Sequence, residues 1–438
     1  MTEIADFSVV GLLRAYVGRT LTATQVVEAC LDRIAATDGE IGAWASVSPG
    51  AALAEARACD ADLRAGRPFR LLHGVPVGIK DIIDVAGMPK TNGGPAFAHT
   101  RPKRDAALVA RLREHGAIIL GKTVATPFAY RDPAGTRNPW ALDHTPGGSS
   151  SGSAAAVAAG HVPLAIGTQT IGSMLRPAAF CGVVGLKGDH GDVPLDGVLP
   201  LAPSLDHAGA FARQVFEAAM AQRAMAGRLV RVPELATPPR LVAPPELFDR
   251  AEPGPRRALD DVVASFTAAG ATVVREPLPV PVDDVVRAGM TVLEAEAAAQ
   301  HRTWFAAHGD EYPPLIHDLV AAGLAPDPDE LEAAQRARAE FRAAIGPWLA
   351  TFDAVLSPVA PGPAPVLGSG TSDPALCAPW TYAGVPAISI PTGLDGDGLP
   401  LAIQLVSAPG ALDPLLGTAA WCERIVRFSD VTSPFSRQ

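Results

Sequence analysis

Residues 145–187, TPGGSSSGSAAAVAAGHVPLAIGTQTIGSMLRPAAFCGVVGLK, decide the fold. This stretch passes from a Gly/Ser-rich loop to an alanine-rich run of helical character. Two short apolar runs with the character of strands, VPLAIG and VVGLK, follow it. Short strands that alternate with helices are typical of a buried, mainly parallel sheet. The stretch therefore predicts an α/β protein.

The same alternation continues on both sides of this stretch. Upstream it runs through LLHGVPVGIKD, a helix around 105–115, and AIILGK. Downstream it returns as DAVLSP, VPAISIPT, LAIQLVSAP and a helix through 411–426. The first 66 residues read as helices, with Thr24 as a candidate N-cap.

The segment at about 228–352 differs, because helical periodicity and mixed charge dominate it. Helices are expected over 254–270, 283–308 and 329–347. Neither a clean linker nor a solenoid repeat divides the chain. Residues 1–438 are therefore expected to form a single catalytic domain with a more helical, less diagnostic segment.

The composition excludes several classes of protein. The 438 residues are 48% hydrophobic and only 19% charged, which excludes a disordered chain. The formal net charge of −10 argues against nucleic acid or an anionic membrane surface as partner. The N-terminus lacks a basic region, and no run of about 18 apolar residues could span a membrane. Five scattered cysteines without a CxxC pair favour reduced thiols in a cytoplasmic protein and no metal site.

Two motifs fit familiar letters but not their physical context. Residues 116–123 match a phosphate-binding loop, yet their variable positions are one apolar run that predicts a buried strand. Residues 148–152 match the GxSxG turn of α/β-hydrolases, but no strand directly precedes them. Neither nucleotide binding nor a hydrolase elbow is therefore favoured.

Lys80 ends the apolar run GVPVGIKD. Burial disfavours the charged form of a lysine and lowers its pKa, and a neutral lysine can serve as a general base. The alternative is a structural lysine that snorkels or pairs with Asp81, Asp84 or another acid.

Two polar turns accompany this lysine. In TPGGSSSGS, paired glycines permit an unusual backbone, and serines such as Ser149 can relay protons or simply cap the following helix. In GTQTIGSMLRPAAFCG, consecutive amides can form a nest for an oxyanion beside Ser173. Alone, either turn would be unremarkable.

Together these features resemble the amidase signature family. The motifs that carry the resemblance are GVPVGIKD at 74–81, the core at 145–187, SLDHAG at 204–209, FDAVLSPVAPGPAP at 352–365, GVPAISIPTG at 384–393 and GLPLAIQLV at 398–406. The resemblance implies the family fold, a large mixed, mostly parallel sheet wrapped by helices. It also implies an amidase that needs no cofactor, with a small amide as its partner and a homodimer as a candidate assembly.

The resemblance also implies a Ser–cis-Ser–Lys triad. Ser173 matches the nucleophile, Ser149 the bridging serine after a cis peptide bond, and Lys80 the base. The amides of Thr170, Ile171, Gly172 and Ser173 would hold the oxyanion. Such an enzyme cleaves the C–N bond through an acyl-enzyme, releasing a carboxylate and ammonia or an amine.

The turn GTQTIGS departs from the common family pattern GTDTGGS. Gln169 in place of Asp, with Arg176 three residues after Ser173, resembles a branch of malonamidase type that acts on small carboxylate-bearing amides. Both are predicted substrate contacts, Arg176 for a carboxylate, since a guanidinium matches that group. Pairing of Arg176 with an acid of the protein is the alternative.

Ile171 stands where the family has Gly. A β-branched residue adds bulk and resists φ > 0, so it implies either a narrower pocket or an impaired oxyanion hole.

Three other functions remain open. They are an acyltransferase or amide-forming enzyme with the same acyl-enzyme, a catalytically impaired binding descendant, and an amidotransferase subunit fed by glutamine. The acidic chain offers no basic RNA surface for the last.

Overall fold

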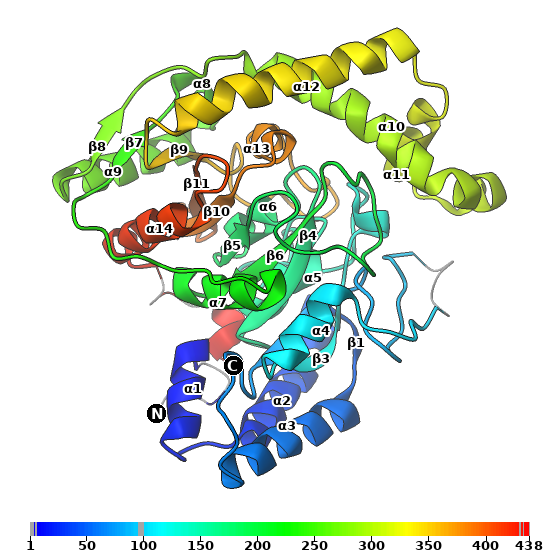
Figure 1. The fold of residues 1–438 in the computed structure, drawn as a ribbon, viewed down its shortest axis with the longest axis vertical. Helices are drawn as coiled ribbons and strands as arrows, with labels where there is room; N and C mark the ends of the chain where they lie inside the picture. The colour runs from blue at the N-terminus through cyan, green and yellow to red at the C-terminus, as the bar shows by residue number, and fades with distance from the viewer. Residues whose placement is uncertain (1–3, 5–6, 95–99, 429–430, 432, 438) are drawn as a thin grey trace.

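The computed structural model describes residues 4, 7–94, 100–428, 431 and 433–437. Within these ranges eleven strands form one sheet (Figure 1). In spatial order they are β1 (Trp44–Val47), β3 (Ile118–Thr123), β2 (Pro76–Lys80), β4 (Leu164–Gln169), β6 (His207–Ala212), β5 (Val184–Lys187), β10 (Ala387–Leu394), β11 (Pro400–Val406), β9 (Ala354–Pro358), β7 (Arg240–Val242) and β8 (Thr272–Val274).

The sheet is mixed, as expected, but it is not mostly parallel. Only the pairs β3–β2, β2–β4, β9–β7 and β7–β8 are parallel. The other six neighbouring pairs are antiparallel. The expectation failed because it assumed helical crossovers throughout. Residues 395–399 instead join β10 to β11 directly, and so short a connection can only return the chain antiparallel.

Helices surround this sheet. They are α1 (Val9–Val17), α2 (Ala23–Ile41), α3 (Pro49–Arg64), α4 (Ala107–Glu114), α5 (Ser151–Ala158), α6 (Leu175–Phe180), α7 (Val215–Ala226), α8 (Pro245–Phe248), α9 (Pro253–Ala268), α10 (Val282–His308), α11 (Pro314–Gly323), α12 (Pro328–Leu349), α13 (Ala378–Ala383) and α14 (Leu412–Val426). The expected helices correspond to α4, α5, α9, α10, α12 and α14. No helix in the described ranges is both long and apolar enough to cross a membrane.

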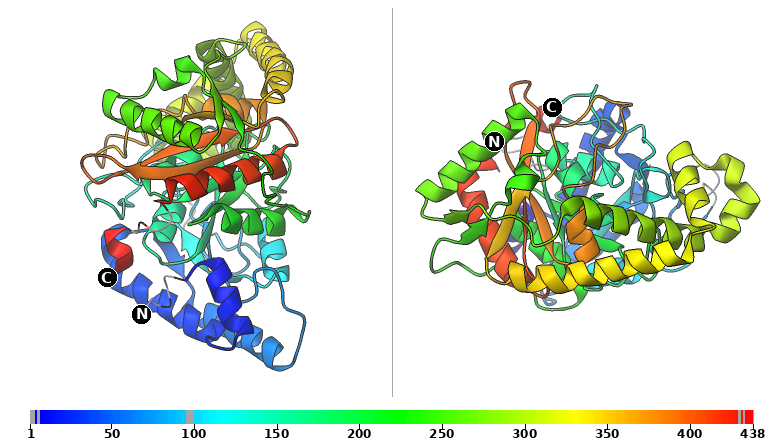
Figure 2. Two further views of the ribbon diagram at one scale, coloured as in Figure 1. Left: turned by 90° about the vertical axis from the view of Figure 1, so that its left-hand side faces the viewer. Right: turned by 90° about the horizontal axis from the view of Figure 1, so that it is seen from above.

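The helices gather at two ends of the molecule. Helices α1–α3 lie at one end, and α10–α12 lie at the other, where they project beyond the sheet (Figures 1 and 2). The segment 228–352 supplies this projection, and it also supplies the short strands β7 and β8. Most of its elements are helices, and β7 and β8 are two strands that periodicity did not indicate.

The N-terminal region differs from the expectation at its first cap and in one strand. Strand β1 lies between α2 and α3, where only helices were expected. The N-cap of α2 is Thr22, whose hydroxyl accepts from Gln25 N at 3.1 Å while Gln25 Oε1 accepts from Thr22 N at 2.9 Å. The Thr24 hydroxyl instead donates to Asp60 at 2.6 Å. Thr24 thus ties α2 to α3, because it already lies inside the helix.

Two glycines seat α6 against the sheet. A Cβ at Gly185 would lie 2.6 Å from the Ala178 Cβ, and one at Gly209 would lie 2.0 Å from Leu186 O of the neighbouring strand and 2.9 Å from the Met174 sulfur. Neither position has room for a side chain. Because α6 begins two residues after Ser173, this close packing fixes the end of the turn that carries Ser173.

We expect Gly185→Ala to lower the free energy of unfolding by about 1–3 kcal/mol, because the added methyl group overpacks α6. Urea unfolding followed by circular dichroism measures the change. Gly39→Ala is the matched control, since nothing lies within 4 Å of its missing Cβ and Ala favours the helix interior. Equal stability of the two variants would show that α6 is not held by this contact.

Candidate active site

The sheet brings together three residues that lie far apart in the sequence. Lys80 is the last residue of β2, and Ser173 follows β4. Strands β2 and β4 are parallel neighbours, so their carboxyl ends meet at the same edge. Ser149 lies in the loop before α5, and Ser150 N donates to Ser173 O at 3.3 Å. All three predicted triad residues therefore lie at one site.

Lys80 is completely buried and bonds to hydroxyl groups. Its Nζ donates to Ser149 Oγ and to Thr168 Oγ1, each at 2.8 Å. The nearby acids are engaged elsewhere: Asp81 accepts from Lys122 at 3.0 Å and Asp84 from Lys90 at 2.6 Å. The structure therefore contradicts the alternative in which Lys80 is a structural lysine paired with one of these acids.

Burial determines the protonation of Lys80. It lowers the pKa of Lys80 well below the usual value, and the charge of Asp206 opposes this effect only in part. Thr168 was not among the predicted site residues. Its place in GTQT gave no chemical signal, because only the paired strands β2 and β4 bring its hydroxyl to Lys80.

Ser149 is held in a loop whose other serines have partners of their own. The Gly148–Ser149 peptide bond is cis, as the resemblance implied. Thr126 N donates to Ser149 O at 3.0 Å, and Ser150 Oγ donates to Thr168 O at 3.1 Å. Ser151 Oγ donates to Gly147 O at 2.7 Å. Ser149 is thus the serine of this loop whose hydroxyl bonds to Lys80.

Ser173 is the outermost of the three residues. It is 8% exposed, whereas Ser149 is 1% exposed and Lys80 is 0% exposed. Within the described ranges the Ser173 hydroxyl makes no hydrogen bond to Ser149, so the Lys80–Ser149 half of the relay is the preformed half. Hydrogen bonds of this kind often close only when substrate binds.

The turn around Ser173 presents free amides. The N–H groups of Thr170, Ile171, Gly172 and Ser173 donate to no acceptor in the part of the chain that the structure describes. The next two amides, those of Met174 and Leu175, donate to Gln169 Oε1 at 2.9 and 3.1 Å. Free amides beside a hydroxyl suit an anionic oxygen.

Gln169 does not occupy the place predicted for a substrate contact. Its side chain is buried, and besides accepting the two amides it donates to Thr381 Oγ1 at 2.9 Å. Thr381 Oγ1 in turn donates to Ile171 O at 3.0 Å. The prediction failed because the Gln169 amide joins the start of α6 to α13. It shapes the turn rather than facing a ligand.

Arg176 is buried and has no acidic partner among the described residues. Its Nη1 donates to the carbonyls of Thr371 and Ser372, and Nη2 donates to Gly148 O at 3.3 Å. Its Nε is buried without a partner, beside Gly172, where a Cβ would lie 2.8 Å from it. Burial lowers the pKa of Arg176 to about 10. The alternative pairing with an acid is therefore not observed.

Known proteins resemble this chain in sequence and in fold. The family model described as Amidase matches residues 25–414. The chain is 33% identical to a glutamyl-tRNA(Gln) amidotransferase subunit of Chloroflexus aggregans, over 93% of this chain and 94% of that protein. The chain belongs to the amidase signature family.

Solved structures of other amidases agree with this assignment. One amidase crystal structure superimposes with a TM-score of 0.90 at 31% identity, covering 96% of this chain and 100% of that one. Native peptide amidase from Stenotrophomonas maltophilia superimposes with a TM-score of 0.82 at 31% identity, covering 96% and 97%. These likenesses show the amidase signature fold.

Ile171 fits this amidase without strain. It is not among the described non-glycine residues with positive φ, so the conformation that a β-branched residue resists is not required. Its side chain is buried in the main hydrophobic core. The backbone conflict that would have impaired the oxyanion hole is therefore not observed, and the narrower pocket stays a prediction.

Cysteines and metal ligands give no further site. All five cysteines are free and buried. In the described ranges no three His, Cys, Asp or Glu side chains gather where they could hold a metal ion.

We expect Lys80→Arg to lower kcat by about 10²–10⁴-fold, because Arg does not deprotonate and a positioned base contributes that much. Wild-type activity should fall as the pH drops through the lowered pKa of Lys80, since protonation removes the base. Lys90→Arg, which can keep its ion pair with Asp84, is the control. More than a tenth of wild-type kcat in Lys80→Arg would contradict this role.

Proposed function

We propose that this amidase hydrolyses the C–N bond of a small amide that carries a free carboxylate, through an ester on Ser173. The observation that carries the proposal is the buried Lys80–Ser149 hydrogen bond beside a turn of free amides at Ser173. The family assignment supports hydrolysis of an amide.

The first half of the reaction forms the acyl-enzyme. Ser173 Oγ attacks the amide carbon while its proton passes to Ser149 and the Ser149 proton passes to neutral Lys80. The carbonyl oxygen becomes an anion that the free amides of the turn stabilise; one such donor is typically worth about 2.7–4 kcal/mol. The C–N bond then breaks, and the relay returns the proton to the leaving nitrogen.

The second half releases the acid. A water molecule attacks the ester carbon and gives its proton to the same relay. The bond to Ser173 breaks, the relay protonates Ser173 Oγ, and the carboxylate product leaves. Both halves need Lys80 without its proton at the start, which burial favours.

The unpaired N–H groups of Arg176 are the reason to propose a carboxylate on the substrate. Three of its five N–H groups bond to backbone carbonyls, so Nε–H and one hydrogen on Nη2 have no acceptor in the described residues. Two N–H groups of a guanidinium match the two oxygens of a carboxylate. The Nε group lies beside Gly172, next to Ser173, which limits the substrate to a short spacing between carboxylate and amide.

A fluorophosphonate should form one adduct on Ser173, because this hydroxyl is the outermost of the relay and lies beside the free amides. Intact-protein mass spectrometry and peptide mapping locate the adduct. Ser173→Ala should remain unlabelled, whereas Ser150→Ala should still react, since Ser150 Oγ bonds to Thr168 O. An adduct on Ser150 would overturn the assignment of the nucleophile.

Arg176 should make the enzyme prefer an amide with a free carboxylate over its neutral methyl ester. The measured quantity is the ratio of kcat/KM for the two substrates, by ammonia release. In Arg176→Ala the ratio should fall to about one, mainly through KM. Loss of the contacts to Thr371 and Ser372 lowers both rates alike and leaves the ratio unchanged. An unchanged ratio in the variant would therefore assign Arg176 to structure alone.

An amidotransferase component is the second candidate, because relatives from Chloroflexus aggregans and Geobacter metallireducens, each 33% identical to this chain, are glutamyl-tRNA(Gln) amidotransferase subunits. A screen of small amides distinguishes an amidase from an amidotransferase component and from an acyltransferase. Ammonia release from carboxylate-bearing amides by the isolated chain, with Ser173→Ala as blank, supports the amidase. Release from glutamine alone would favour the amidotransferase, and turnover that requires an added amine would favour an acyltransferase.

A further inference from the structure

Asp206 is a buried carboxylate that the relay does not use. It precedes β6, and its Oδ1 accepts from Thr170 Oγ1 at 2.6 Å. Its Oδ2 accepts from Leu201 N at 2.9 Å and from Ala202 N at 3.1 Å. The carboxylate therefore ties the loop before β6 to Thr170, the first of the free amides.

The hydrogen bond from Thr170 to Asp206 is one of two restraints on the turn. The second restraint is Thr381 of α13, which donates to Ile171 O and accepts from Gln169. The turn is thus hydrogen-bonded both to Asp206 and to α13. Amides that must meet an oxyanion act best when their direction is fixed beforehand, because no reorganisation is then needed during the reaction.

Asp206 also lies close enough to Lys80 for its charge to act there, because Thr168, which accepts from Lys80, pairs with Ala208, two residues after Asp206. Lys80 has no ion-pair partner among the described residues, and the carboxylate of Asp206 favours its protonated form. Burial raises the pKa of Asp206 to about 6, the Glu296 charge on α10 adds to that effect, and the hydrogen bonds from Thr170, Leu201 and Ala202 oppose it. One side chain is therefore coupled to both halves of the site.

We propose that Asp206 is a positioning residue of this amidase, which holds the oxyanion turn through Thr170 and acts on Lys80 through its charge. The inference rests on the proposed reaction at Ser173. It concerns how the turn and the base are set, so it can be tested without knowing the substrate.

The test measures the rate of fluorophosphonate labelling of Ser173 across pH, together with kcat and KM for any amide that is turned over. Thr170→Val removes the anchoring hydroxyl at nearly constant shape. It should slow labelling and lower kcat by roughly 10–100-fold, with little change in KM. This effect is at most about as large as the loss of one oxyanion donor, because the amides are misdirected and not removed. Thr170→Ser, which keeps the hydroxyl, should restore most of the rate.

Asp206→Asn removes the charge. It should move the acid limb of the labelling profile to lower pH, because the carboxylate that favours protonated Lys80 is gone. Thr170→Val keeps the Asp206 carboxylate and removes only one of the hydrogen bonds that favour its charged form, so it should move this limb less than Asp206→Asn does. A purely structural role for Asp206 would lower the amount of active protein without moving the limb.

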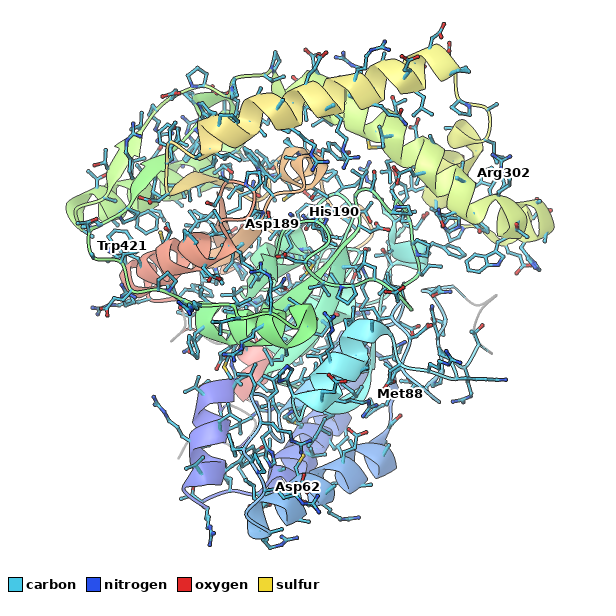
Figure 3. All side chains as sticks on the ribbon, in the orientation of Figure 1. Asp62, Met88, Asp189, His190, Arg302 and Trp421 are labelled. Carbon is cyan, nitrogen blue, oxygen red and sulfur yellow. The ribbon has the colours of Figure 1, made fainter. Side chains whose placement is uncertain are left out.

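Asp60→Asn is the matched control. Asp60 accepts from Ala23 N at 2.7 Å, from Thr24 N at 3.1 Å and from Thr24 Oγ1 at 2.6 Å, the same kinds of donor as those that bind Asp206. It belongs to α3, and Figure 3 places Asp62 of that helix far from His190, which lies in the loop between β5 and β6. Asp60→Asn should cost stability but leave the pH profile of the labelling rate unchanged.

The outcomes separate the two proposals. If no amide is turned over but Ser173 labels with the expected pattern in the variants, the proposed substrate class fails and the role of Asp206 stands. If Thr170→Val labels within twofold of wild type and Asp206→Asn keeps the wild-type acid limb, the role of Asp206 is overturned. Should Asp206→Asn fail to fold, the pair Thr170→Val and Thr170→Ser still decides.

Discussion

Lys80 is buried at the carboxyl end of β2 with two hydroxyl groups as partners, and no carboxylate of the described residues contacts it. The site is built around this constraint. A charged ammonium group in that place would lack both water and a counterion, so the neutral form is favoured. The acids that could have neutralised it bond elsewhere, Asp81 to Lys122 and Asp84 to Lys90. A lysine without its proton is what a serine nucleophile at pH 7 needs.

The groups in contact with Lys80 are neutral, so they hold it in place without favouring its charged form. The hydroxyls of Ser149 and Thr168 contact Lys80, and the Asp206 carboxylate acts on it without contact. The turn around Ser173 is fixed by Gln169, Thr381 and Asp206, while its own amides stay free. The close seating of α6 on Gly185 and Gly209 leaves the turn little freedom to move. Such preorganisation lowers the cost of stabilising an oxyanion.

Arg176 is a buried cation with an observed structural role, to which our proposal adds recognition of the substrate. Its hydrogen bonds to the carbonyls of Thr371, Ser372 and Gly148 join two loops that border the site. The same bonds leave Nε without a partner beside Gly172, where a Cβ would lie 2.8 Å from it. The protein supplies no acid to this guanidinium in the described ranges, and this is the ground on which we propose a carboxylate-bearing substrate.

The sequence by itself determined the family and the order of most helices and strands, and it predicted Lys80, Ser149 and Ser173 as a triad, because these follow from local patterns and motif order. Only the tertiary structure decided that six strand pairs are antiparallel, that Gln169 braces α13 while Arg176 meets carbonyls, and that Thr168 and Asp206 reach the site. Pairing, burial and hydrogen-bond partners depend on residues distant in the chain, so no local pattern contains them.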